Sequence, residues 1–242
     1  MQLETYETSV KRSARQLTVF IRPDTTDIKV IKEVLQQCVY EKPSIEFFIE
    51  STDVWLDLGG NIGTFSLLAL ARGAKVLAYE PETENFALMR KNVAKNFKNT
   101  PHFRAVQKAV GVKAGTLDLY LCKGAYNKYR HTLHPVRGRE TVPVSVVTLR
   151  SVLRKNPDLT AIKMDIEGAE IELMEAMTPR DYQGIRKMVV EYSFDVDRSI
   201  PRFLRIMKQL QTYFPHVHWT KVKPDEEFYN YFPAATLVFC YF

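Results

Sequence analysis

A run of small and polar residues follows a short apolar segment in VWLDLGGNIGTFSLL. Five of its residues could hold a ligand against the backbone: Asp57, Gly59, Gly60, Asn61 and Gly63. Glycines let the chain turn sharply and approach a ligand, and the first turn of a following helix offers unpaired N–H groups. The dinucleotide motif G-x-G-x-x-G does not fit, because counted from Gly59 its later glycines fall on Asn61 and Thr64. A P-loop motif is also absent.

The sequence Tyr79-Glu80-Pro81 ends the next apolar segment. A carboxylate at the end of the second strand of a strand–helix–strand unit can accept hydrogen bonds from both ribose hydroxyls of a nucleoside. Pro81 then ends the strand. A solvated glutamate and a tight turn are each ordinary structural features. At the spacing of one such unit, the two together favour a nucleoside site.

Acidic residues gather in a second segment, AIKMDIEGAEIELM. Residues two apart on a strand share a face, so Lys163 and Asp165 are expected on one side of the sheet, with Glu167 in the turn that follows. Asp165 should therefore stand at the carboxyl edge of the sheet, close to the predicted nucleoside. Glu170 lies in the first turn of the next helix, where a carboxylate suits the helix dipole.

A proton-transfer reaction beside the predicted nucleoside would need a positioned base, which contributes roughly 10²- to 10⁴-fold in rate. Asp165 is the favoured base because of its place at the sheet edge, although a role in positioning a cofactor is an equal alternative. The other candidates are Glu167, Glu191, and His131 or His134. For Glu167 and Glu170 the structural alternative is a helix cap. Acids at strand ends could also hold Mg²⁺, but nothing in their spacing requires a metal and none is expected.

The segment from Cys122 to Arg139 combines cations and aromatic residues without an acid. Aromatic faces suit sugar rings or bases, and cations suit phosphate. The segment is therefore expected either to bind the second substrate of the site, including an anionic one, or to be a solvated surface loop. Its members are Lys123, Tyr126, Lys128, Tyr129, Arg130, His131, His134, Arg137 and Arg139.

Alternating strands and helices must position these residues. Periodicity predicts helices over 28–38, 62–71, 84–97, 170–177 and 200–213, the first of them capped by Asp24 or Asp27. Strands are predicted over 16–22, 54–58, 75–79, 103–110, 116–121, 142–149, 161–166, 187–192, 216–222 and 235–242. This order predicts an α/β fold with a mostly parallel twisted sheet, helices on both faces and an antiparallel final strand. A lead-in over 1–52 should pack on a core domain over 53–242.

Composition places the chain among ordinary globular proteins, with 242 residues, 45% apolar and 26% charged. The net charge of +6 is compatible with an anionic partner, although an excess of this size is more often a matter of solubility. The sparse cysteines Cys38, Cys122 and Cys240 fit a reducing compartment, so a cytoplasmic location is expected. The longest apolar stretch, 64–71, is too short to span a bilayer, and the first ten residues do not read as a signal peptide.

Four segments together resemble the FkbM-type S-adenosylmethionine-dependent methyltransferases. They are DLGGNIGTFSLLAL, the Tyr79-Glu80-Pro81 turn, VPVSVVTLRSVL and IKMDIEGAEIELM. The lead-in FIRPDTTDIKVIKEVL is similar as well, so the likeness extends from about residue 17 to 194. The resemblance implies a Rossmann-like methyltransferase fold, S-adenosyl-L-methionine as cofactor, and O-methylation of hydroxyls on sugars, glycolipids or secondary metabolites.

The resemblance also implies roles for single residues. Glu80, with Pro81 beside it, would bind the ribose of the cofactor. Ala109 and Val110, at the end of the third strand, would face the adenine through their backbone, because Lys108-Ala109-Val110 offers no acid or amide. The methionine end would lie against Asp57, Gly59, Gly60, Asn61 and Gly63, with Asp165 close by.

Two alternatives remain beside a sugar or small-molecule O-methyltransferase. The basic charge and the basic–aromatic segment would suit an RNA methyltransferase, although no RNA-binding module or N-P-P-Y type motif is present. A non-catalytic nucleic-acid-binding domain on a methyltransferase fold is the third reading, which the intact Asp57, Glu80 and Asp165 disfavour. Nucleic-acid binding is therefore not expected, and the oligomeric state is left open.

Overall fold

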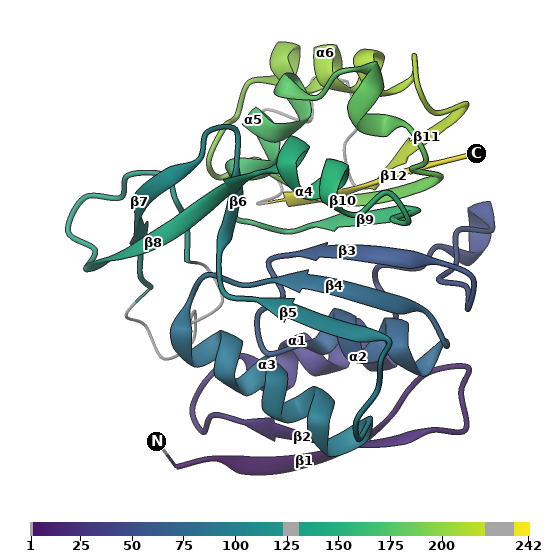
Figure 1. The fold of residues 1–242 in the computed structure, drawn as a ribbon, viewed down its shortest axis with the longest axis vertical. Helices are drawn as coiled ribbons and strands as arrows, with labels where there is room; N and C mark the ends of the chain where they lie inside the picture. The colour runs from purple at the N-terminus through teal and green to yellow at the C-terminus, as the bar shows by residue number, and fades with distance from the viewer. Residues whose placement is uncertain (1, 123–130, 221–234) are drawn as a thin grey trace.

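A seven-stranded sheet forms the centre of the molecule in the computed structural model, which describes residues 2–122, 131–220 and 235–242 (Figure 1). Its strand order is β11-β12-β10-β9-β3-β4-β5. Strands β5, β4, β3, β9 and β10 run parallel, whereas β12 is antiparallel to both of its neighbours. The expected mostly parallel sheet with an antiparallel final strand is confirmed. The strands are β3 (Val54–Leu58), β4 (Lys75–Tyr79), β5 (Phe103–Val106), β9 (Ala161–Met164), β10 (Lys187–Ser193), β11 (His216–Trp219) and β12 (Ala235–Tyr241).

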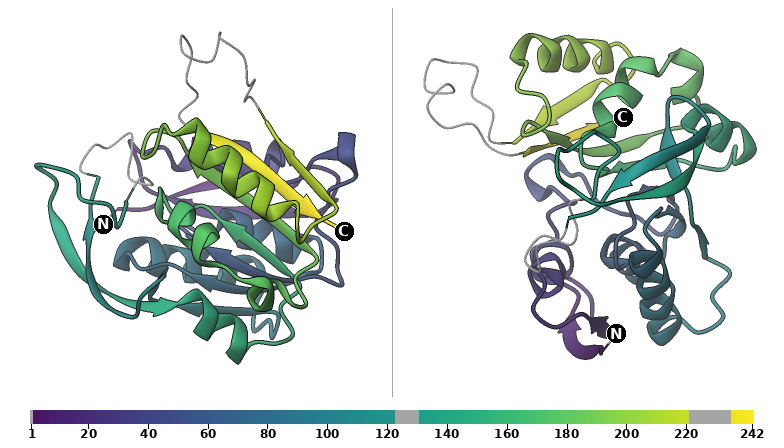
Figure 2. Two further views of the ribbon diagram at one scale, coloured as in Figure 1. Left: turned by 90° about the horizontal axis from the view of Figure 1, so that it is seen from above. Right: turned by 90° about the vertical axis from the view of Figure 1, so that its left-hand side faces the viewer.

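Helices cover both faces of this sheet, as Figures 1 and 2 show. On one face lie α1 (Asp27–Ile31), α2 (Thr64–Ala71) and α3 (Thr83–Asn96), and on the other α4 (Leu149–Lys155), α5 (Ala169–Ala176) and α6 (Ile200–Leu210). Successive side chains of a buried strand enter opposite layers, so Trp55 joins the core of the first face and Leu56 that of the second. In the described ranges, the helices all fall short of the length and apolarity needed to cross a membrane.

The N-terminal segment packs on the first face through α3. Strands β1 (Glu4–Ser9) and β2 (Gln16–Ile21) form a separate antiparallel hairpin. Asn92 and Asn96, one turn apart on α3, bind the outer edge of β2, with Phe20 N donating to Asn92 Oδ1 at 2.7 Å and Thr18 N to Asn96 Oδ1 at 2.9 Å. Two side-chain amides thus take the place of a neighbouring strand. The division of the chain at residue 52 stays a prediction.

The prediction of a single strand over 103–110 is wrong. Its first half is β5 of the central sheet, and its second half is β6 (Ala109–Gly111) of a three-stranded sheet with β7 (Gly115–Tyr120) and β8 (Thr141–Thr148). The chain turns between them, where Lys108 N donates to Val106 O at 3.0 Å. Neither glycine nor proline marks this turn, so the sequence there looks like one continuous strand.

The first helix also differs from its prediction. Regular α-helix ends at Ile31 and continues as a π-helical segment, η1 (Lys32–Gln36). The expected cap by Asp24 or Asp27 is wrong, because the N-cap residue is Thr26 and it makes no side-chain cap bond. The carboxylate of Asp27 is instead bound by the backbone and guanidinium of Arg22, and both side chains are buried. The sequence reading also missed β1, α4 and the 3₁₀ turns η2 (Pro43–Ile45) and η4 (Pro179–Tyr182).

Candidate functional site

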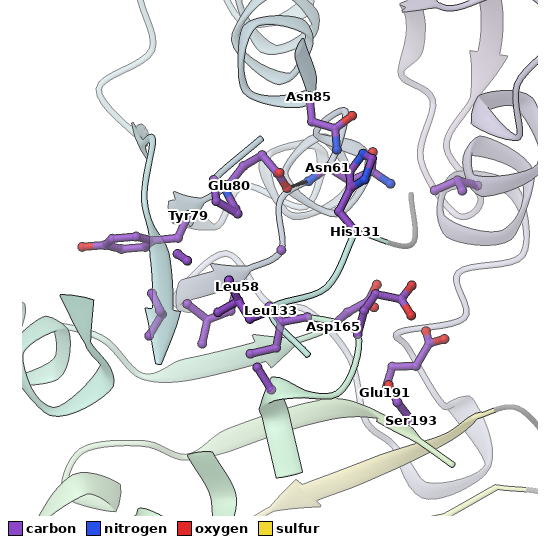
Figure 3. Close-up of a pocket in the computed structure, with 18 of the residues that line it drawn as sticks. Leu58, Asn61, Tyr79, Glu80, Asn85, His131, Leu133, Asp165, Glu191 and Ser193 are labelled. Atoms are coloured by element: carbon purple, nitrogen blue, oxygen red, sulfur yellow. Dashed lines mark hydrogen bonds between the residues drawn. The ribbon is translucent and has the colours of Figure 1, made fainter. Parts of the chain in front are cut away.

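A cavity of about 670 Å³ opens at the carboxyl edge of the parallel strands (Figure 3). Residues at or just after the carboxyl ends of β3, β4, β9 and β10 line it, together with residues of β6 and of the N-terminal segment. Ligands of open α/β sheets bind at this edge, so the cavity is the candidate active site. Its polar lining residues are Lys29, Glu33, Tyr40, Asn61, Glu80, Asn85, Lys108, His131, Asp165, Glu167, Glu191 and Ser193.

The glycine loop after β3 forms one wall of this cavity. Gly59 (φ +79°) and Asn61 (φ +49°) are both left-handed, a conformation that glycine adopts freely and asparagine tolerates. The backbone N–H groups of Gly59 and Gly60 each donate to Tyr79 O at 3.0 Å, which ties the loop to β4. The Oδ1 atom of Asn61 is buried and lacks a hydrogen-bond partner among the described residues. That oxygen is an unused hydrogen-bond acceptor in the wall of the cavity.

Glu80 faces the glycine loop from the end of β4. Its Oε2 accepts from Asn61 N at 2.8 Å and its Oε1 from Glu82 N at 2.9 Å, as Figure 3 shows for the first of these bonds. Burial raises the pKa of Glu80 to about 7, although the two backbone donors favour its charged form. A buried carboxylate with this geometry is suited to accept further hydrogen bonds from hydroxyl groups.

Asp165 and Glu191 lie together across the cavity from Glu80 (Figure 3). Asp165 directly follows β9, and its Oδ2 accepts from the Tyr40 hydroxyl at 2.8 Å. Glu191 lies near the carboxyl end of β10, two residues before its last residue, Ser193. The negative charge of Asp165, and then burial, raise the pKa of Glu191 to about 8. With this pKa, Glu191 carries a proton at neutral pH.

The buried side chain of Lys163 contacts both Asp165 of this pair and the glycine loop. Its Nζ donates to Gly59 O at 2.8 Å and stands 3.3 Å from Asp57 and 3.6 Å from Asp165. Burial lowers the pKa of Lys163, but the charges of Asp57 and Asp165 outweigh it and raise the pKa above its ordinary value. A buried ammonium thus joins the loop to the acid pair.

Three expected cofactor contacts, Asp57, Gly60 and Gly63, do not line the cavity. Asp57 is fully buried, and its carboxylate accepts from Ser66 Oγ at 2.8 Å on the α2 side of the sheet. The alternation of β3 turns Leu58 toward the cavity and Asp57 away from it. Asp57 therefore stabilises the glycine loop indirectly, through its contacts with Lys163 and with Ser66 of α2. Gly59, Asn61, Glu80, Pro81 and Ala109 do line the cavity.

The remaining base candidates differ in their surroundings. Glu167 lines the cavity from a left-handed position (φ +52°), and its carbonyl accepts from Thr132 Oγ1 at 2.7 Å. His131 lines it as well, and its Nδ1 accepts from Cys122 N at 3.1 Å. His134 does not line the cavity, and its ring packs against Gly168.

Glu170 is fully buried, and its carboxylate accepts from Gly168 N at 2.8 Å and Ser193 N at 2.9 Å. Burial raises the pKa of Glu170 to about 7. The side chain braces the start of α5 against the end of β10. The bond to Gly168 N at the start of α5 corresponds to the helix-capping role given above as the structural alternative for Glu170.

Sequence reasoning missed several polar groups of the cavity, among them Tyr40 and Asn85. Tyr40 comes from the N-terminal segment, 125 residues before the acid it binds. Asn85 comes from α3, and its Oδ1 accepts from Arg22 Nη1 at 2.8 Å. No motif contains either residue, and only their spatial neighbours reveal them.

The basic–aromatic segment is described only in part. Residues 123–130, and with them Lys123, Tyr126, Lys128, Tyr129 and Arg130, lie outside the described residues. The part that is described reaches the cavity through His131 and Leu133. Within the described ranges, no group of three or more His, Cys, Asp or Glu side chains could hold a metal ion.

Comparison with known proteins gives consistent matches. A family model described as the methyltransferase FkbM domain matches residues 57–214. Methyltransferase sdnD of Sordaria araneosa is 28% identical over 194 residues, covering 67% of this chain and 73% of that protein. Methyltransferase FkbM of Methylobacillus flagellatus KT is a solved structure with a TM-score of 0.53 at 16% identity, covering 87% of this chain. This chain spans about half, 52%, of that protein's length, and the likeness supports the fold described above.

Proposed function

The chain belongs to the FkbM methyltransferase family, and from this premise we propose that it methylates a hydroxyl of a sugar, a glycan or a related small molecule, with S-adenosyl-L-methionine as the donor. One observation carries the proposal. A single cavity has a nucleoside-type wall, with the glycine loop and Glu80, opposite a pair of carboxylates, Asp165 and Glu191. Donor and base are then placed on either side of one acceptor.

The residues of the first wall fit the donor. Glu80 can accept from the ribose hydroxyls, and the unpartnered Oδ1 of Asn61 offers another acceptor in the same wall. Leu58, Ala109 and Val110 supply apolar surface for a flat base. Ala109 and Val110 were expected at the end of a third strand of the main sheet, but they lie in β6 of the three-stranded sheet. The cavity volume of about 670 Å³ is within the range of cofactor sites.

The bound donor would supply an electrophilic methyl group on a sulfonium, which is already a good leaving group. The protein's part is to hold a hydroxyl oxygen in line with that methyl carbon and to accept its proton. We assign the proton to Asp165, whose side chain is 27% exposed at the cavity surface. Glu191, with a pKa of about 8, would carry its own proton at neutral pH. Glu167 and His131 remain the alternative bases.

The acceptor side favours a neutral hydroxyl compound over a phosphorylated one. Among the described residues it combines the acids Glu33, Asp165 and Glu167 with the protonated Glu191, and the neighbouring Lys29 is paired with Glu33 at 3.8 Å. Carboxylates can accept from sugar hydroxyls but repel phosphate. The net charge of +6 of the whole chain is therefore not concentrated among the described residues of this part of the cavity.

Binding and transfer assays test the proposal. Calorimetry should detect S-adenosylmethionine binding, and labelled donor should mark neutral monosaccharide or glycan acceptors. RNA should be assayed at two salt concentrations, because binding driven by phosphate weakens sharply with salt. Transfer of label to RNA and not to any hydroxyl compound would replace the proposed substrate class by an RNA methyltransferase. Failure to bind the donor would refute the proposal altogether.

Replacement of Glu80 by Gln is expected to weaken donor binding about 10- to 100-fold, the loss of roughly 1.5–3 kcal/mol from hydrogen bonds to a charged group. Because the pKa of Glu80 is about 7, its carboxylate is ionised above pH 7 and protonated below. Wild-type affinity should therefore rise between pH 6 and pH 8, and that rise should vanish in Glu80→Gln. Calorimetry at both pH values measures it. Glu172→Gln, on the exposed side of α5, is the control, and an equal affinity in the two variants would contradict the role of Glu80.

A further inference from the structure

Tyr40 brings a side chain of the N-terminal segment into the candidate site. It lies between η1 and η2, before the residues 57–214 that the family model matches. Its ring is buried and packs edge-on against Phe65 with centroids 5.5 Å apart. Burial raises the pKa of Tyr40 well above its ordinary value, so the hydroxyl keeps its proton and can donate it in a hydrogen bond.

The acceptor of that hydrogen bond is one particular oxygen of Asp165. The Tyr40 hydroxyl donates to Oδ2 at 2.8 Å, and the ammonium of Lys163 stands 3.6 Å from the same oxygen. Both contacts fall on Oδ2, and Asp165 lines the cavity. The other oxygen, Oδ1, is thereby the one available to an acceptor.

We propose that Tyr40 is a positioning residue of the methyl-transfer site, whose hydroxyl fixes Oδ2 of Asp165 and leaves Oδ1 to take the proton of the acceptor. This inference rests on the proposed function. Tyr40 itself exchanges no proton. Its effect is to hold the carboxylate in one orientation, which a reaction that depends on in-line geometry requires.

Tyr40 also influences how the acid pair shares its proton. The groups that face Glu191 come from several elements, namely Tyr40 of the N-terminal segment, Glu33 of η1, Lys163 of β9 with Asp165 after it, and Glu170 of α5. A hydrogen bond to the charged form of Asp165 favours the arrangement with the proton on Glu191. Loss of the Tyr40 hydroxyl should therefore lower the pKa of Glu191.

The substitution Tyr40→Phe removes the hydroxyl and keeps the ring. It is expected to lower kcat about tenfold while donor affinity remains as in the wild type. Tyr192→Phe is the matched control, because the Tyr192 hydroxyl is also buried but lacks a hydrogen-bond partner among the described residues. A donor affinity that falls together with kcat in Tyr40→Phe, or an unchanged kcat, would overturn the positioning role.

Two further measurements isolate the contact with Asp165. In an Asp165→Asn background, Tyr40→Phe should cause no further fall in kcat, and additive losses would overturn the proposal. Carbon-13 NMR of the Glu191 carboxyl should show a lower titration midpoint in Tyr40→Phe than in the wild type, and an unchanged midpoint would likewise overturn it. The titration needs neither donor nor acceptor. It therefore tests the contact of Tyr40 with Asp165 even if the wild type transfers no methyl group and the proposed function fails.

Discussion

Replacement of Asp165 by Asn is expected to lower kcat by roughly 10²-fold or more while donor affinity is retained. Asparagine keeps the shape of the side chain, and its amide oxygen can still accept from the Tyr40 hydroxyl. It cannot take a proton from a hydroxyl group at neutral pH. A rate loss without a binding loss is the signature of a residue that acts in the chemical step.

Single-turnover kinetics and calorimetry, with Asp158→Asn on the exposed turn before β9 as the matched control, measure the two effects separately. A variant that loses the donor would make Asp165 a cofactor-positioning acid, and Glu167, Glu191 or His131 would then be the base. A variant that changes neither quantity would contradict the mechanism. Asn tests this more sharply than Ala, because Ala would also remove the contact with Tyr40.

Replacement of Gly59 by Ala is expected to abolish donor binding. A Cβ at this position would stand 1.9 Å from the carbonyl oxygen of Asp165, and the residue is left-handed with φ +79°. The neighbouring backbone has little freedom to yield, because Asp165 N donates to Leu58 O at 3.1 Å. The left-handed backbone alone costs about 1–2 kcal/mol, and the clash must be relieved by displacing the loop or the acid.

Gly138→Ala separates these two effects. Gly138 has nearly the same φ, +80°, but a Cβ there would have no atom within 4 Å. It should lose stability through backbone strain alone and bind the donor normally. Calorimetry and thermal unfolding of both variants measure this difference, and equal donor affinities would show that Gly59 is needed only for its conformation.

The parts of the site predicted from sequence are those encoded within one strand and its following turn. Gly59, Asn61 and Glu80 form a local strand–helix–strand unit, so their types and spacing indicated a common wall of one cavity, where the structure places them. Asp165 was placed at the sheet edge by the same reasoning. Short-range geometry is sufficient for such residues because parallel strands end at one edge.

Contacts between distant segments were beyond this reasoning. Tyr40 meets Asp165 across 125 residues, and nothing near either residue indicates the pairing. Asp57 was expected at the ligand because it belongs to the glycine motif, yet strand alternation turns it toward Ser66. The turn between β5 and β6 was missed because neither glycine nor proline marks it.

The attachment of β2 to α3 determines how the N-terminal segment opens. Since Asn92 and Asn96 bind both N–H and carbonyl groups of β2, the strand cannot leave without breaking four hydrogen bonds to these two side-chain amides. The hairpin and α3 should therefore unfold as one cooperative unit, and backbone amide exchange in β2 should follow that of the helix. Because Asn92 also donates to Ile62 O, at 2.9 Å, the same opening would loosen the glycine loop of the candidate site.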